Sequence, residues 1–159
     1  MKQFIDTEFL EDGRTIDLIS IGIVSEDGKE YYCVNEEFDH SRATEWIKQN
    51  VLKHITPYDK WRSKEVIKDE VLEFIGVDKP EFWGYYADYD WVVFCQLFGA
   101  MINLPRGWPM YCRDIKQLCD SLGNPPLPEQ GKGEHHALAD ARWNKRVYEY
   151  LTKFNGNNK

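Results

Sequence analysis

The sequence lacks long apolar runs: its 159 residues contain no stretch of about twenty consecutive apolar side chains, the length that spans a bilayer. The first residues, Met1 to Asp6, also lack the apolar core of a signal peptide and lead directly into a predicted strand. We therefore expect a cytoplasmic protein without a membrane partner.

Paired cysteines are also missing. The four cysteines stand at positions 33, 95, 112 and 119, and none forms a Cys-x-x-Cys pair. This spacing argues against a cysteine zinc site. Without a signal peptide, it favours reduced, mostly buried thiols over disulfides.

Positive charge is scarce, because 20 Lys and Arg stand against 27 Asp and Glu, for a net charge of −7. A module that binds nucleic acid by bulk attraction to phosphate is normally basic, so this class is disfavoured. An enzyme that acts on nucleic acid through bound metal ions is not excluded, because divalent ions make a cleft locally positive.

The length fits one domain, and we expect it over residues 1–154, with a disordered tail over 155–159. Apolar periodicity and turn residues predict five strands, at residues 4–10, 17–25, 30–36, 81–87 and 110–112. They predict five helices, at residues 42–54, 64–75, 89–101, 115–122 and 136–153. This order indicates an α/β fold with a five-stranded mixed sheet flanked by helices, of which the ribonuclease-H-like fold is one example.

Asp6 and Glu8 lie in the first predicted strand, between apolar residues such as Ile5 and Leu10. Side chains alternate along a strand, so both acids point to one face, roughly 7 Å apart along the backbone. Two carboxylates on a buried strand repel each other and lose hydration, and a divalent metal ion would remove both penalties. Alternatively, the strand lies at an edge and exposes both acids to solvent. This stretch alone supports the two interpretations equally.

Asp88 and Asp90 stand where the fourth predicted strand turns into a helix. Open α/β sheets bind ligands at the carboxyl ends of their strands, so an acid here would face Asp6 and Glu8. The competing interpretation is helix capping, which is common for Asp in a first turn and which suits Asp88 best.

His135 and Asp140 open the last predicted helix, after a loop rich in Pro and Gly. They are five residues apart, which turns them by about 140° on a regular helix, so they do not share a face. If both serve one site, His135 must lie on the loop or at the helix entrance. His136 is four residues before Asp140, so an ordinary i,i+4 pair is the competing interpretation.

Together, these stretches supply four carboxylates and a histidine. Two divalent cations about 3.5–4 Å apart, held by such acids, clamp the attacking and leaving oxygens of a phosphoryl displacement. An unperturbed histidine titrates near pH ~6.5 and can take a proton from the attacking water. The set of residues suits phosphodiester hydrolysis.

Three motifs in order resemble the DEDDh 3′–5′ exonuclease superfamily, which includes ribonuclease T, oligoribonuclease and proofreading exonuclease domains. They are Asp-x-Glu at Asp6, an aromatic-Asp pair at Tyr89, and His-x-Ala-x-x-Asp at His135. Within the superfamily, the sequence is most similar to the RNase AS type of 3′–5′ exoribonuclease, which shares the Asp-Gly turn found here at Asp12. The resemblance spans the chain from residue 4 to about residue 150.

The resemblance implies a ribonuclease-H-like fold and a metal-dependent enzyme that removes 5′-mononucleotides from the 3′ end of single-stranded RNA. It implies that Asp6, Glu8, Asp90 and Asp140 bind two Mg²⁺ ions, or Mn²⁺, and that His135 is the general base, with Glu8 also catalytic. It also implies a preference for adenylate-rich RNA and a homodimer.

One position departs from the superfamily pattern. Many members have Asn shortly before the aromatic-Asp pair, where this chain has Tyr86, so a contact made by that Asn is missing or replaced. The departure leaves Asp88 as a rival to Asp90. We choose Asp90, because it follows Tyr89 directly.

Several residues are candidates for binding substrate. By the resemblance, the backbone around Thr7 and Glu8 contacts the terminal 3′-OH. Phe9, Tyr89 and Trp108 are aromatic candidates for base stacking, although core packing is the more common role of any single aromatic.

Three other functions stay open. The chain is alternatively a 3′–5′ exodeoxyribonuclease, a non-catalytic nucleic-acid-binding protein of the same fold, or an endonuclease of the same broad fold. Metal-dependent product release and closed circular substrates discriminate between them.

Overall fold

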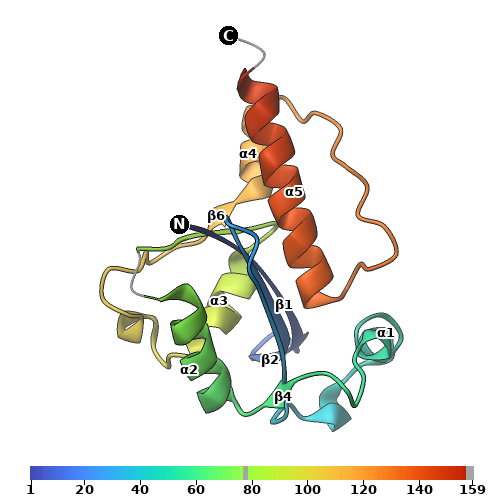
Figure 1. Cartoon of the computed structure of the whole chain (residues 1–159). Helices are drawn as coiled ribbons and strands as arrows, with labels where there is room; N and C mark the ends of the chain where they lie inside the picture. The colour runs from blue at the N-terminus through green and yellow to red at the C-terminus, as the bar shows by residue number, and fades with distance from the viewer. Residues whose placement is uncertain (77–78, 157–159) are drawn as a thin grey trace.

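The computed structural model describes residues 1–76 and 79–156, which form a sheet with helices on both faces (Figure 1). The six strands are β1 (Lys2–Glu11), β2 (Ile16–Ser25), β3 (Glu30–Asn35), β4 (Trp61–Arg62), β5 (Glu81–Gly84) and β6 (Arg113–Asp114). Their order in the sheet is β4-β3-β2-β1-β5-β6. The first three strands pair antiparallel, and each later strand lies parallel to its neighbour.

The mixed sheet confirms the predicted fold class and is consistent with a ribonuclease-H-like fold, but the number of strands differs. The additional strand, β4, pairs with the end of β3 through only two residues, too few for alternation to reveal. The predicted strand at 110–112 is wrong in position, because the pairing with β5 occurs at Arg113 and Asp114. Such short edge strands are defined by their partner rather than by their own sequence pattern.

The helices are α1 (Glu45–Asn50), α2 (Lys64–Ile75), α3 (Asp88–Gln96), α4 (Ile115–Ser121) and α5 (Ala137–Gly156), with 3-10 turns at His40–Arg42, Leu52–His54 and Met101–Asn103. The predicted helix 42–54 is wrong at both ends. Thr44 caps α1, since its hydroxyl accepts the Ile47 amide, and the helix stops before the buried Val51. Helix α3 also ends earlier than predicted, at Gln96.

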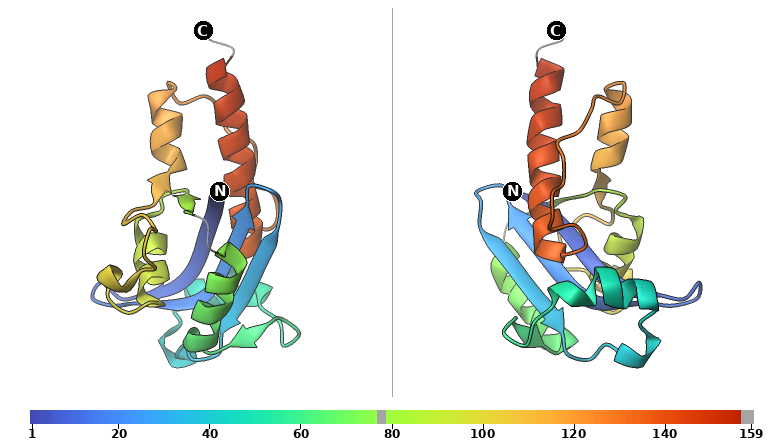
Figure 2. Two further views of the ribbon diagram at one scale, coloured as in Figure 1. Left: turned by 60° about the vertical axis from the view of Figure 1, so that its left-hand side comes forward. Right: turned by 90° about the vertical axis from the view of Figure 1, so that its right-hand side faces the viewer.

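Helices α2 and α3 cover one face of the sheet, and α4 and α5 cover the other (Figures 1 and 2). The alternation of β1 divides the core accordingly. Ile5 packs with residues of α2 and α3, whereas Phe4 packs with residues of α4 and α5. Strand β1 is therefore buried on both sides, and its side chains reach both layers.

Helix α5 lies very close to β2. A Cβ atom added to Gly22 would lie 2.4 Å from the backbone carbon of Ala137, the first residue of α5. The missing side chain at Gly22 thus allows the start of α5 to contact the strand backbone, which fixes the helix entrance beside β1 and β2.

Helix α5 extends beyond its predicted end, and the four cysteines form no disulfide. Helix α5 reaches Gly156, two residues into the predicted tail, and the rest of that tail, 157–159, lies outside the described residues. The four cysteines are free thiols, and Cys33, Cys95 and Cys119 are buried. Within the described ranges, no helix is both long and apolar enough to cross a membrane.

Candidate active site

A pocket of about 340 Å³ opens beside the middle of β1. Strand β1, helices α1, α3 and α5, and the loop before α5 contribute to its wall, which consists of Asp6, Thr7, Glu8, Phe9, Trp46, Ile47, Asp90, His135 and Asp140. The structure therefore brings together all four acids and the histidine that the sequence predicts.

Asp6 and Glu8 share the face of β1 that carries Phe4 and is covered by α5. Both are half-buried, and β1 pairs with β2 alongside them. The pairing register shifts between Glu8 and Phe9, which marks a bulge directly after the two acids. Bulges re-aim side chains and often lie beside active sites, and this one places Phe9 at the pocket wall.

Asp90 occupies the place that a neighbouring strand would take. Strand β5 pairs with β1 only at Lys2–Phe4, so the edge of β1 on the β5 side has no strand partner at Thr7. There the Asp90 carboxylate accepts the Thr7 amide at 2.7 Å and the Thr7 hydroxyl at 2.6 Å. These bonds satisfy the open strand edge and fix Asp90 beside Asp6 and Glu8.

The two candidate acids of α3 lie in different surroundings. Asp90 is buried and lines this pocket, whereas Asp88 is exposed and lines a separate pocket with Trp91 and Tyr111. The N-cap of α3 is Ala87, without a side-chain bond. The structure places Asp90 with the other acids and leaves Asp88 outside them.

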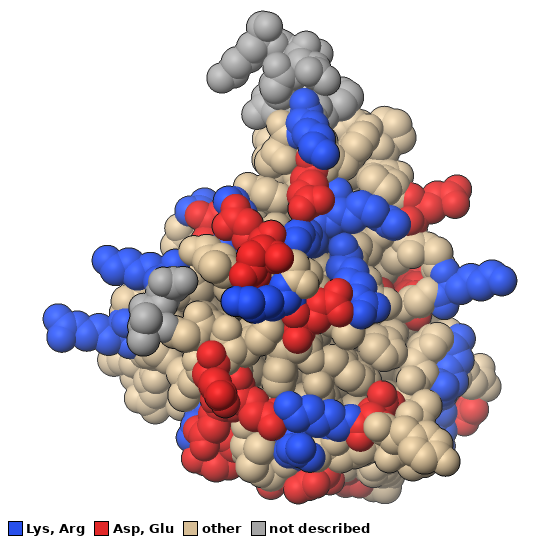
Figure 3. All heavy atoms as spheres, in the orientation of Figure 1, with Lys and Arg blue, Asp and Glu red and all other residues tan. Residues whose placement is uncertain are grey.

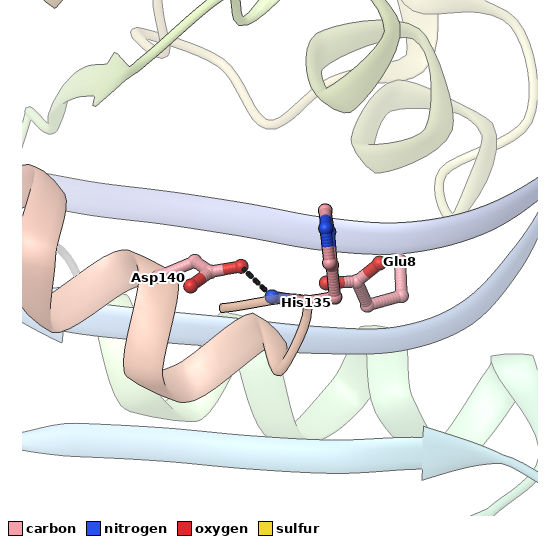
Figure 4. Close-up of side chains that lie close together, drawn as sticks. All are labelled: Glu8, His135 and Asp140. Carbon is pink, nitrogen blue, oxygen red and sulfur yellow. Dashed lines mark hydrogen bonds between the residues drawn. The ribbon is translucent and has the colours of Figure 1, made fainter. Parts of the chain in front are cut away.

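His135 lies before α5, at the helix entrance, as the five-residue spacing requires if both residues serve one site. Its backbone has a positive φ of 69°, a left-handed conformation uncommon for a residue other than glycine. The His135 amide donates to Asp140 Oδ2 at 2.9 Å, and Figure 4 shows this bond beside the Glu8 side chain. Gln130 Nε2 donates to the other carboxylate oxygen of Asp140, Oδ1, at 2.7 Å.

His136 has a structural role instead. Its ring stacks on Tyr32 with 4.6 Å between centroids, and its Nδ1 accepts the Ala139 amide at 3.4 Å. His136 therefore contacts the first turn of α5 and packs against β3 through Tyr32, so no i,i+4 pair with the Asp140 carboxylate is formed.

The crowded acids perturb one another. Burial raises the pKa of Asp6 well above its ordinary value, and the charges of Asp90, Glu8 and Asp140 raise it further. Burial likewise raises the pKa of Glu8, with added repulsion from Asp140 and Asp90. For Asp90, burial raises the pKa, although the bonds from Thr7 oppose the shift.

Asp140 follows the same rule: burial raises its pKa, while the bonds from Gln130 and His135 lower it. Ligand atoms of Glu8, His135 and Asp140 all lie within 4.8 Å of one another. With Asp6 and Asp90 in the same pocket, the donors are mainly carboxylate oxygens, which Mg²⁺ and Mn²⁺ prefer.

Of the three aromatic residues predicted to bind substrate, Phe9 and Tyr89 lie at or beside the pocket and Trp108 lies in the core. Phe9 lines the pocket and packs against Tyr89, with 5.9 Å between ring centroids, and Tyr89 is 56% exposed. Trp108 is a wrong prediction: it is buried against Phe82 and Phe98 in the core on the α3 side, where shape and apolar burial account for it.

Thr7 lines the pocket, and its amide and its hydroxyl both donate to Asp90. These two donors fix the position of the Asp90 carboxylate. The predicted contact of the backbone around Thr7 and Glu8 with a terminal 3′-OH stays a prediction.

Three residues of the site are absent from the sequence motifs: Trp46, Ile47 and Gln130. Trp46, on α1, lines the pocket with 54% of its surface exposed, and its ring meets the His135 ring nearly edge-on at 5.0 Å. Gln130 lies in the Pro- and Gly-rich loop. The signal for Trp46 is a large aromatic beside the apolar stripe of a helix, while no local pattern distinguishes Gln130.

Comparison with known proteins agrees with this geometry. Residues 1–152 match the family described as "3′–5′ exoribonuclease Rv2179c-like domain". Similar relatives include the 3′–5′ exoribonuclease MT2234.1 of Mycobacterium tuberculosis (strain CDC 1551 / Oshkosh) and the 3′–5′ exoribonuclease Rv2179c of the same species (strain ATCC 25618 / H37Rv). Each is 43% identical to this chain over 157 residues, which is 96% of this chain and 94% of the relative.

The match covers every motif on which the predicted superfamily resemblance rests, and both relatives carry names of the predicted enzyme class. The chain belongs to the family of Rv2179c-like 3′–5′ exoribonuclease domains, in agreement with a DEDDh-type exonuclease.

Proposed function

We propose that this protein is a metal-dependent 3′–5′ exoribonuclease that releases 5′-mononucleotides from single-stranded RNA. The observation that carries the proposal is the convergence of Asp6, Glu8, Asp90 and Asp140 with His135 around one open pocket. The names of the relatives support RNA as the substrate and the 3′ end as the starting point. We also propose that residues 1–154 form a single catalytic domain.

Asp6, Glu8, Asp90 and Asp140 would hold two Mg²⁺ ions, with Mn²⁺ as the alternative. The fit rests on the carboxylate donors and on the raised pKa of all four groups, because burial disfavours their charged forms and cations would offset that penalty as well as the repulsion among the acids. When bound, such ions stabilise charge on the attacking and leaving oxygens of a phosphodiester displacement. Thr7 and Gln130 would keep two of the carboxylates in place.

His135 is the general base of this proposal. An imidazole nitrogen would take the proton from the attacking water, and the Asp140 bond to the His135 amide keeps the ring at the pocket. Glu8 lies within reach of the same water, because its ligand atom is within 4.8 Å of that of His135. Phe9 and Trp46 offer aromatic surface for the terminal base.

The central test uses 5′-labelled RNA and DNA homopolymers with Mg²⁺, with Mn²⁺ or with EDTA, followed by sizing of the products. We expect stepwise shortening of RNA from the 3′ end, release of 5′-mononucleotides, and no reaction with EDTA. Absence of any product at all metal concentrations overturns the proposal. Faster hydrolysis of DNA than of RNA favours the exodeoxyribonuclease.

Two controls separate the remaining alternatives. Closed circular RNA has no 3′ end, so its cleavage would indicate an endonuclease. RNA binding without a metal-dependent product would indicate the non-catalytic binding protein.

We also propose the adenylate preference and the homodimer that the resemblance implies. The homopolymer series measures the first as a higher kcat/KM for adenylate than for uridylate or cytidylate. Light scattering during gel filtration measures the second, and a monomer mass would overturn the homodimer.

A further inference from the structure

A second, smaller pocket adjoins the active site. It has a volume of about 180 Å³ and lies between the β1–β2 hairpin and the outer face of α3. The hairpin projects beyond the rest of the sheet (Figure 2). Arg14, Thr15 and Ile16 line the pocket from the hairpin, and Tyr89 and Val92 line it from α3.

The two pockets share an aromatic boundary. Tyr89 lines the small pocket, Phe9 lines the active site, and their rings pack at 5.9 Å between centroids. Tyr89 is 56% exposed and Val92 is 45% exposed, so both offer apolar surface that the fold does not cover. A strand leaving the active site past Phe9 would therefore meet Tyr89 and this pocket.

The two acids of the hairpin, Glu11 and Asp12, form hydrogen bonds or ion pairs with nearby residues, whereas the side chain of Arg14 does not. Asp12 accepts the amides of Arg14 and Thr15 and forms an ion pair with Arg42 at 3.1 Å. Glu11 accepts the amide of Gly13 at 2.5 Å. Within residues 1–76 and 79–156, the Arg14 guanidinium has no hydrogen bond or ion pair, although the chain carries a net charge of −7.

We propose that this pocket is a subsite for single-stranded RNA on the 5′ side of the scissile bond. An upstream base packs against Tyr89 and Val92, and Arg14 binds the first phosphate upstream of the scissile phosphate. An exposed aromatic beside an unpaired arginine is the combination that single-strand binding uses, because every base has a face to stack and every nucleotide a phosphate. The subsite rests on the proposed exoribonuclease function and extends it to recognition of strand length.

The subsite has a consequence that the active site alone does not have. A dinucleotide contains only the scissile phosphate, so it offers nothing for Arg14 to bind. An octanucleotide offers several upstream phosphates. The wild-type protein should therefore show a lower KM for octa-adenylate than for diadenylate, with a similar kcat.

The test compares Arg14→Ala with wild type on diadenylate and octa-adenylate. We expect a KM for octa-adenylate raised about tenfold, an unchanged kcat, and no change on diadenylate. The salt dependence of octa-adenylate binding should weaken, its log–log slope falling by about 0.7 for the one lost phosphate contact. Arg14→Lys should recover part of the affinity, since it keeps the charge. Arg106→Ala is the matched control, because Arg106 is exposed outside both pockets.

Equal effects of Arg14→Ala on both substrates, or no effect on either, overturn the subsite. A change in oligomer mass with unchanged length dependence also overturns it and assigns the surface to contact with another protein copy. If wild type hydrolyses neither substrate, the proposed function fails instead. Fluorescence anisotropy with labelled octa-adenylate then tests the subsite separately, and equal affinity of wild type and Arg14→Ala contradicts it.

Discussion

Two acidic side chains are buried among the described residues, Asp90 and Asp140, and each keeps only 7% of its surface exposed. Both have hydrogen-bond donors dedicated to them: Thr7 for Asp90, and Gln130 with the His135 amide for Asp140. Buried charge is costly unless paired, so such positions indicate a function other than stability. The structure thus separates Asp90 from Asp88, which the sequence alone leaves as competing candidates.

Asp88 and Asp90 provide a matched pair for mutation. Asp90→Asn removes a charge from the pocket, and we expect kcat to fall about 100-fold or more, because in the proposed function the acids would hold the ions that supply several kcal/mol of charge stabilisation. Asp88→Asn should retain nearly full activity, since Asp88 is exposed outside the pocket. The measurement is steady-state hydrolysis of octa-adenylate, with circular dichroism to check folding. Equal losses in both variants would contradict the assignment of Asp90.

Among the elements, the long and strongly patterned ones follow from the sequence. The apolar residues of β1 and β2 and the stripe of α2 are local signals, and Ser63 and Gly76 mark the ends of α2 by capping and a left-handed turn. The two-residue strands β4 and β6 do not follow, because their pairing depends on partners distant in the chain.

The candidate site is predictable to the same extent. Asp6, Glu8 and Asp140 belong to motifs with fixed spacing, so local sequence places them. Trp46 reaches the pocket only because the segment after β3 folds beside the entrance of α5, as Figure 1 shows for α1. The prediction that Trp108 stacks on a base is wrong, because no local sequence pattern distinguishes an aromatic in the core from one that lines a pocket.

The contact between β2 and α5 gives a prediction for these elements. Gly22→Ala would place a Cβ atom 2.4 Å from the backbone of Ala137 and 2.5 Å from the Leu138 amide nitrogen. Because backbone atoms cannot turn aside as a side chain can, the start of α5 must shift. We expect a loss of about 1–3 kcal/mol in the free energy of unfolding, measured in urea.

The same substitution should lower kcat, because the helix entrance carries Asp140 and follows His135. Both effects should appear together in Gly22→Ala. Full stability with wild-type activity would show that the close contact does not hold the entrance of α5 in place.

The face of the molecule shown in Figure 3 has no continuous basic surface, because acidic and basic side chains are interspersed on it. Bulk attraction to phosphate is therefore a weak source of RNA affinity for this chain, whose net charge is −7. In the proposed function, local contacts would supply the affinity: metal ions at the acids, aromatic surface, and single cations such as Arg14.

The pocket acids also affect the stability of the whole fold. Burial raises the pKa of Asp6, Glu8, Asp90 and Asp140 above their ordinary values, so the folded, metal-free protein binds more protons than the unfolded chain. Stability then falls as the pH rises from the ordinary carboxyl pKa, about 4, through the raised values. Each unit of raised pKa corresponds to about 1.4 kcal/mol.

Asp6→Asn tests this link between the site and the fold. Removing one carboxylate should raise the Tm of the metal-free protein, more at pH 8 than at pH 5, because the repulsion it relieves is largest when the acids are ionised. Mg²⁺ or Mn²⁺ should raise the Tm of wild type more at pH 8 than at pH 5, because fewer protons compete for the ligands at pH 8, and should raise that of Asp6→Asn less. Thermal unfolding of both proteins, in EDTA and in metal, at pH 5 and at pH 8, gives the eight Tm values that these comparisons need. If the metal-free Asp6→Asn variant is less stable than wild type at pH 8, the Asp6 carboxylate stabilises the fold. That result would contradict the expectation that this carboxylate destabilises the metal-free protein and is offset by cation binding.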